Sequence, residues 1–161
     1  MKRSVSRDIM IGLLLIDKRL WPSILIAVVC VVAMFLPKAT FGEGCAWWSY
    51  MLYHFSHANI YHLALNLWAL YSFKPRWATC GVGFIASTLA AFIPFASMSV
   101  PTCGLSGFLM AAYARKYAEY KLPLWKPIVA NLVFVFFPMF NWKIHILSFL
   151  IGYAIWRFRR M

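Results

Sequence analysis

The stretch Trp21–Leu36, WPSILIAVVCVVAMFL, is apolar almost from end to end and sets the pattern for the rest of the chain. Five further runs of the same character follow it, at 57–73, 78–96, 102–117, 125–140 and 143–157. Several are shorter than the ~20 residues expected of an ordinary membrane-spanning helix. Short helices can be matched by local thinning of a bilayer. The six runs therefore predict an all-α chain of six membrane-spanning helices.

The overall composition favours the same interpretation. Hydrophobic residues make up 63% of the 161 residues and charged residues only 12%, whereas a soluble domain has about a quarter charged residues. The apolar excess is more than a soluble core needs, so we expect most of it to face lipid or other helices. The sequence thus predicts a polytopic membrane protein with a single membrane domain covering residues 1–161.

The basic residues predict an orientation for these helices. The formal net charge is +12, but the charges cluster between the apolar runs instead of along one polar face, which argues against nucleic acid. If the N-terminus is cytoplasmic and the runs alternate, only Lys38 and Lys143 of the 16 basic residues fall outside. This bias predicts a multi-pass protein of the cell inner membrane with both termini cytoplasmic.

Three further features fit this topology. Residues 1–19 are expected to form a cytoplasmic helix lying on the membrane and not a cleaved signal, because charged residues follow its short apolar stretch. The aromatic-rich loop 37–56 is expected to lie in the outer leaflet, packed on the helices.

The four cysteines lack metal-binding spacing. Cys45 and Cys103 could meet near the outer face and form a disulfide.

The few acidic residues restrict the chemistry. The chain has four, Asp8, Asp17, Glu43 and Glu119, and none lies at the centre of an apolar run. A pair of buried aspartates is therefore excluded, and no H-E-x-x-H zinc motif occurs. We expect neither a metal nor a cofactor. Serine, histidine and asparagine remain as the polar candidates, and polar residues within apolar runs are functional candidates.

One serine and one histidine are expected at matching depth on different helices. Ser106 lies in Gly104-Leu105-Ser106-Gly107 at the start of the fourth run, and His145 enters the sixth run from the same side. Small residues, including Gly107 and Gly152, would let these helices touch. The two side chains could then form a nucleophile and its base. Packing alone could equally explain the glycines and serine, and a buried histidine could simply bond to a backbone carbonyl.

His62 and Asn66 form a second polar pair, in the run 57–73. They are four residues apart, so they project from one face of a helix. Hydrogen-bond donors in a low-dielectric site are what a developing oxyanion requires. The other interpretation, that these side chains only satisfy each other or the loop backbone, is equally consistent with the spacing.

Taken together, three motifs resemble the rhomboid intramembrane serine proteases. They are His57-x4-His62-x3-Asn66, Gly104-Leu105-Ser106-Gly107, and His145 seven residues before Gly152. They occur in that family's order and cover most of the chain from about Trp47. The resemblance implies a six-helix bundle that hydrolyses peptide bonds in or next to transmembrane segments of its substrates.

The resemblance also implies a role for each matching residue. Ser106 would be the nucleophile and His145 the general base, without an acidic third member. His62, Asn66 and the backbone N–H of Ser106 would hold the oxyanion, with the active site open to the non-cytoplasmic face. His57 would tie the outer loop to the second helix, and Gly104, Gly107 and Gly152 would be structural. The expected partners are transmembrane protein substrates and the lipid bilayer, and the sequence carries no signal of the oligomeric state.

Two positions depart from the family pattern. Many rhomboids have Trp-Arg in the first outer loop, where this chain has Trp48-Ser49. The aromatic residue often found four positions after the serine is Met110 here, whose thioether can also pack on an imidazole.

Three alternatives remain: a non-proteolytic rhomboid-like protein that binds transmembrane helices, a rhombosortase-type processor of C-terminal sorting tails, and a small transporter. The transporter lacks support, because the runs show no inverted repeat.

Overall fold

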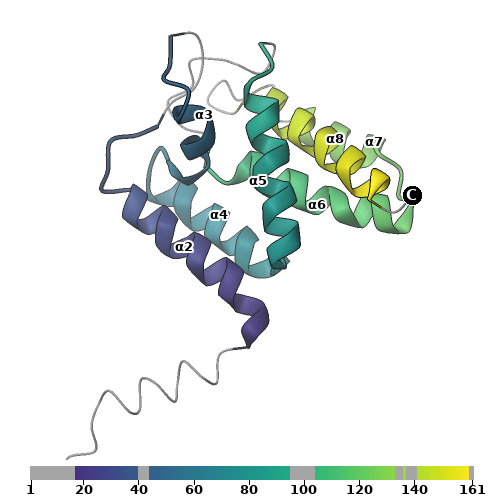
Figure 1. Cartoon of the computed structure of the whole chain (residues 1–161), viewed down its shortest axis with the longest axis horizontal. Coiled ribbons are helices and arrows are strands. Elements are labelled where there is room, and N and C mark those ends of the chain that lie inside the picture. Colours follow the sequence, from purple (N-terminus) through teal and green to yellow (C-terminus); the bar gives the residue numbers. More distant parts are fainter. Residues whose placement is uncertain (1–16, 40–43, 95–103, 133–135, 137–140, 160–161) are drawn as a thin grey trace, which may run out of the picture.

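The computed structural model describes residues 17–39, 44–94, 104–132, 136 and 141–159. The part of the chain that it describes is all-α (Figure 1). Its elements are η1 (Lys18–Leu20), α2 (Trp21–Ala33), α3 (Ser49–Leu52), η2 (Tyr53–Phe55), α4 (Ile60–Phe73), α5 (Trp77–Ala91), α6 (Ser106–Tyr120), α7 (Trp125–Leu132) and α8 (Trp142–Phe158).

Local sequence signals set several of the helix ends. Asn59 caps α4, because its Oδ1 accepts a hydrogen bond of 2.9 Å from the backbone N–H of His62. Asn141 caps α8 in the same way, at 3.4 Å from the nitrogen of Ile144. At its other end α4 stops at Lys74, whose left-handed backbone (φ 46°) precedes Pro75. A left-handed residue followed by proline cannot continue a helix.

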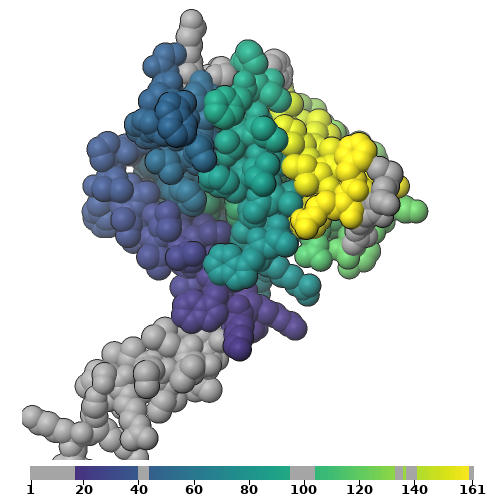
Figure 2. Space-filling model, viewed as in Figure 1, coloured from purple at the N-terminus to yellow at the C-terminus, as the bar shows by residue number. Residues whose placement is uncertain are grey.

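The helices form two groups, which meet where α4 contacts α6. The helices α5, α6 and α8 pack against one another, while α2 lies beside α4 and α4 also contacts α6 (Figure 1). In the space-filling view α5 separates the purple-blue α2 side from the yellow α8 (Figure 2). α7 packs on α8. The fourth and sixth predicted helices are therefore direct neighbours.

The backbones of α6 and α8 approach closely at small residues. A Cβ atom on Gly152 would lie 2.7 Å from the carbonyl oxygen of Ala111 and 2.9 Å from its Cα. One turn away, a Cβ on Gly107 would lie 3.1 Å from Oγ of Ser148. Only glycine fits at Gly152 without a shift of backbone. The contact that the small residues predict is present.

Aromatic and polar side chains fasten the loop before α4 to α5. The Tyr53 hydroxyl donates a 2.9 Å hydrogen bond to the carbonyl oxygen of Ser87, and His54 Nε2 lies 3.1 Å from Oγ1 of Thr88. Tyr53 and His54 are both fully buried. This portion of the predicted loop 37–56 is thus packed on the helices. Residues 1–16 and 40–43, and Cys103 of the suggested disulfide, lie outside the described residues.

The prediction of membrane-spanning helices is wrong for the described part of the chain. None of its helices is both long enough and apolar enough to cross a membrane. The longest, α8, has 17 residues, which at ~1.5 Å per residue gives about 25 Å. The hydrocarbon core of a bilayer is about 30 Å thick. This finding overturns the polytopic membrane fold, its orientation with cytoplasmic termini, and the location in the inner membrane as a multi-pass protein.

The error arises because apolar runs and helices have different ends. Each predicted run overlaps a helix, but α2 stops at Ala33 instead of Leu36, and α5 stops at Ala91 instead of residue 96. The run 102–117 is displaced to Ser106–Tyr120, so α6 includes three charged residues, Arg115, Lys116 and Glu119. In α2 and α5, apolar residues that follow the end of the helix made the predicted run longer than the helix itself.

Much of the apolar excess is on the surface of α2 and α4. The side chains of Leu25, Val28 and Val32 on α2, and of Leu65 and Trp68 on α4, are each more than half exposed. The composition therefore does reflect apolar side chains outside the core. The composition does not imply membrane-spanning helices, because none of the described helices is long and apolar enough to cross a bilayer.

We expect Gly152→Ala to destabilise the fold. The new methyl group would meet backbone atoms of Ala111, and overpacking of this kind costs about 1–3 kcal/mol. Gly81→Ala in α5 is the matched control, since nothing lies within 4 Å of its added Cβ. Alanine there should stabilise the helix by up to about 1 kcal/mol. Denaturant unfolding measures both changes, and equal effects of the two substitutions would contradict the close approach of α6 and α8.

Candidate active site

Ser106 is the first residue of α6, and the turn before it is held in place. Gly104 adopts φ +54°, and its N–H donates a 3.0 Å hydrogen bond to the carbonyl oxygen of Ser56. The N–H groups in the first turn of a helix have no acceptor within the helix. They also lie at the positive end of the helix dipole. Ser106 therefore stands where several backbone donors can meet a negative charge.

Asn66 on α4 contacts Ser106 directly. The Ser106 hydroxyl donates to Asn66 Oδ1 at 3.4 Å, a long and therefore weak hydrogen bond. The Nδ2 group of Asn66 is buried and has no hydrogen-bond acceptor among the described residues. A buried donor without an acceptor costs free energy and calls for an explanation. A ligand oxygen beside Ser106 would supply the missing acceptor.

His57 and His62 pack next to this pair. His57 Nδ1 lies 3.0 Å from the carbonyl oxygen of Phe55, and its ring is edge-on to that of His62, with centroids 5.2 Å apart. A Cβ on Gly104 would come within 2.8 Å of the His57 ring and 2.9 Å of Asn66 Nδ2. Glycine is thus required at 104 both for its backbone angle and for space. His57 links the loop before α4, the helix α4 and the turn before Ser106.

His145 is buried in the first turns of α8, where Asn131 fixes its orientation. Its Nδ1 lies 3.2 Å from Asn131 Oδ1. The Nδ2 of Asn131 donates to the carbonyl oxygen of Pro127 at 2.8 Å and contacts the sulfur of Met110 at 3.7 Å. Because Asn131 Oδ1 can only accept, Nδ1 of His145 carries the proton. Its Nε2 then has the lone pair that a general base needs.

Burial keeps His145 neutral. Loss of solvent, with a smaller contribution from the charge of nearby His62, lowers the pKa of His145 from 6.5 to about 4. Burial also lowers the pKa of His62. Both imidazoles are neutral at pH 7, which suits a base and a hydrogen-bond donor respectively.

The predicted site residues come from three helices that meet at one end of the bundle. Gly107, next to Ser106, has Ile144 and Ser148 as neighbours on α8, and these two residues flank His145. Asn66 reaches Ser106 from α4, and the charge of His62 acts on His145. The structure therefore brings Ser106 to Asn66 and places His62 close enough to His145 to affect its pKa. The hydroxyl of Ser106 points to Asn66 in this arrangement.

Sequence reasoning missed Asn131. It is the one amide in the apolar stretch of the predicted fifth helix, and it is buried with only 5% of its surface exposed. A single amide within an apolar run was the sequence signal that could have identified Asn131 as a candidate site residue. Met110, noted as a departure from the rhomboid pattern, has its sulfur on Asn131 Nδ2. It thus acts on His145 through Asn131.

Comparison with protein-family models and with curated proteins gives no match for this chain. The resemblance to rhomboids therefore rests on the sequence motifs and stays a prediction.

Acid should destabilise the protein through its buried histidines. Burial lowers the pKa of His54 to about 3 and of His57 and His145 to about 4. The unfolded chain, with ordinary histidine pKa values, binds more protons between about pH 6.5 and pH 4. The free energy of unfolding should be level above pH 6.5 and fall below it, by about 1 kcal/mol or more per pH unit.

Denaturant unfolding at pH 7.5, 6, 5 and 4.5 measures this slope. His54→Gln removes one of the titrating groups, away from Ser106, and should make the slope shallower. A free energy of unfolding that stays constant from pH 7.5 to pH 4.5 would show that these histidines are not buried in neutral form.

Proposed function

We propose that this chain is a serine peptidase in which Ser106 is the nucleophile and His145 the general base. The proposed substrates are proteins cut in or next to their transmembrane segments, as the resemblance to rhomboids suggests. The chain itself is not proposed to cross a membrane. A substrate helix has to unwind at the cut, since a helical backbone shields its own carbonyl groups.

The unpaired donor of Asn66 beside Ser106 is the observation that carries this proposal. Attack on a carbonyl places a negative oxygen close to the serine, and buried donors stabilise that charge more than water does. Asn66 Nδ2 is buried without an acceptor among the described residues, and α6, which begins at Ser106, adds backbone N–H groups that have no acceptor within the helix. A site that only packs two helices together would not need this surplus of donors.

The chemistry is acyl transfer without an acidic residue. Rotation of the Ser106 side chain away from Asn66 would direct its hydroxyl to Nε2 of His145, which takes the proton as the oxygen attacks. His145 then gives that proton to the leaving amine as the peptide C–N bond breaks, and the acyl-enzyme that remains is hydrolysed by water that the same, again neutral, histidine activates. His145 becomes an imidazolium in the transition state, and Asn131 Oδ1 accepts its Nδ1–H throughout. Asn131 is thus the positioning residue in place of an aspartate.

The hydrogen bond from Ser106 to Asn66 favours a second candidate function. A serine whose hydroxyl is engaged by an amide is also consistent with a non-proteolytic protein that binds transmembrane helices. The two functions differ in turnover. Capture of a substrate helix without cleavage, together with an unreactive Ser106, would support binding alone.

A fluorophosphonate probe should label the wild-type chain at Ser106. Labelling requires a serine activated by its base, so Ser106→Ala should abolish it and His145→Ala should reduce it strongly. Ser148→Ala is the matched control, because Ser148 is buried on α8 and its hydroxyl has no partner among the described residues. That variant should be labelled like the wild type. Lack of labelling on the wild type, or labelling that survives Ser106→Ala, would refute the proposal.

Replacing Asn131 should affect the rate and its dependence on pH. Asn131→Leu removes the acceptor of His145 Nδ1–H, so kcat should fall by at least about tenfold while KM changes little. In the wild type, kcat/KM should be level at neutral pH and fall as pH drops through about 4, where His145 becomes protonated. Asn131→Asp places a carboxylate beside the imidazole, so the acid limb should move towards neutral pH.

Cleavage of a model transmembrane substrate between pH 3.5 and pH 8 provides the measurement. A residue that only packs would lower the amount of folded protein without moving the acid limb. An Asn131→Asp profile identical to that of the wild type would contradict the positioning role.

A further inference from the structure

A basic cleft lies at the other end of α6 from Ser106. Its volume is about 390 Å³, within the range of small-molecule sites. The ends of α4, α5 and α6 line it, and its charged members are Lys74, Arg76, Arg115, Lys116 and Glu119. Four basic side chains against one carboxylate leave a net charge of +3. A cleft lined by one sign of charge concentrates ions of the opposite sign.

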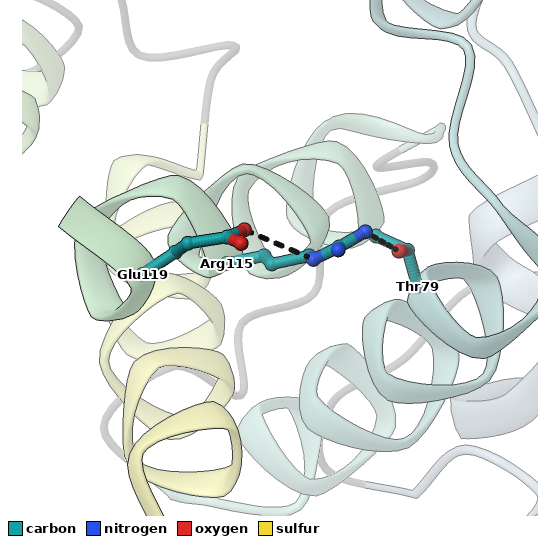
Figure 3. A network of polar contacts seen from close by, with 3 residues as sticks. All are labelled: Thr79, Arg115 and Glu119. Carbon is teal, nitrogen blue, oxygen red and sulfur yellow. Dashed lines mark hydrogen bonds and ion pairs between the residues drawn. The ribbon is translucent and has the colours of Figure 1, made fainter. Parts of the chain in front are cut away.

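Arg115 connects the two walls of the cleft. It reaches from α6 to α5, where its Nη1 donates to Oγ1 of Thr79 at 3.4 Å, and its Nε lies 3.4 Å from Oε2 of Glu119 (Figure 3). Both contacts are long, and a partly exposed ion pair of this kind stabilises little. The guanidinium has five N–H donors in a planar fork. Most of them can therefore serve a ligand in the cleft.

The helix dipoles explain why one of the basic residues lies in the cleft, but they do not explain the position of Arg76. Lys74 is the C-cap of α4, where a cation offsets the negative end of the helix dipole, whereas Lys116 lies before the last turn of α6. Arg76 stands at the opposite pole, as the N-cap of α5, and the cap makes no side-chain hydrogen bond. A cation at that positive end is unfavourable. An anion held in the cleft would offset both Arg76 and the helix end.

We propose that this cleft binds a phosphate group of a small anionic ligand, which is either a free phosphate compound or a phospholipid headgroup. Arg76 and Arg115 are the principal ligands, because a guanidinium matches the oxygens of phosphate in pairs. Thr79, whose hydroxyl accepts from Arg115, can donate its own hydrogen to the same group. This binding site is separate from Ser106 and does not depend on peptidase activity.

Titration of the full-length chain with inorganic pyrophosphate tests the proposal. A non-ionic detergent keeps the protein in solution, because many apolar side chains are exposed. We expect saturable binding by calorimetry, a rise in the melting temperature with ligand concentration, and weaker binding as salt increases. Co-sedimentation with phosphatidylcholine vesicles, with and without phosphatidic acid, separates the two sources of phosphate. Binding that requires phosphatidic acid assigns a headgroup, and binding of pyrophosphate alone assigns a free compound.

Variants locate the binding in the cleft. Arg76→Gln, at an exposed residue, should weaken pyrophosphate binding by about tenfold or more. Glu119→Gln should strengthen it, since the one carboxylate of the cleft is removed. Lys126→Gln carries the same charge change as Arg76→Gln but lies outside the cleft, and should bind like the wild type. Absence of binding to either probe, or an equal loss in Lys126→Gln and Arg76→Gln, would overturn the proposal.

Discussion

The close approach of α6 to α8 is the constraint on which the candidate active site depends. Gly152 lies against the backbone of Ala111, and Gly107 lies against Ser148. Because the residues of this seam are glycine, alanine and serine, the first turns of the two helices are held side by side. Those turns carry Ser106 and His145. Larger residues in the seam would separate the helices by several ångströms, and a nucleophile and base must stay within hydrogen-bond reach.

Burial without ionic partners determines how the polar groups of the site behave. The chain has four acidic residues in all, and of the two in the described residues Asp17 accepts from the N–H of Arg19 and Glu119 pairs with Arg115, so neither orients His145 as an aspartate would. An asparagine does so instead, and its amide is in turn fixed by Pro127 and Met110. A neutral orienting group does not raise the pKa of the imidazole, whereas burial lowers it. The result is a base that is neutral over the whole physiological range but weaker than one paired with a carboxylate.

The sequence predicted where most of the helices lie and was wrong in making them membrane-spanning. The six predicted apolar runs each overlap one of the helices α2 and α4 to α8, whereas α3 lies in a segment predicted as a loop. Apolar composition could not give helix length, because residues such as Phe35 and Leu36 are apolar without being helical. Asn131 was missed because its role depends on distance in space from His145, fourteen positions along the chain. Whether Ser106 and His145 react remains a prediction.

The two ends of α6 can be tested separately, because the charge at one end acts weakly at the other. Ser106 and Lys116 are ten residues apart on one helix, which at ~1.5 Å per residue is about 15 Å. One unit charge at that distance contributes about 1 kcal/mol at an effective dielectric constant of ~20. Salt with a Debye length of about 8 Å reduces this to a few tenths. Filling the basic cleft with an anion would therefore raise the pKa of His145 only slightly, far less than a carboxylate at position 131 would. A large shift of the acid limb on adding pyrophosphate would have to arise from a movement of α6 and not from its charge.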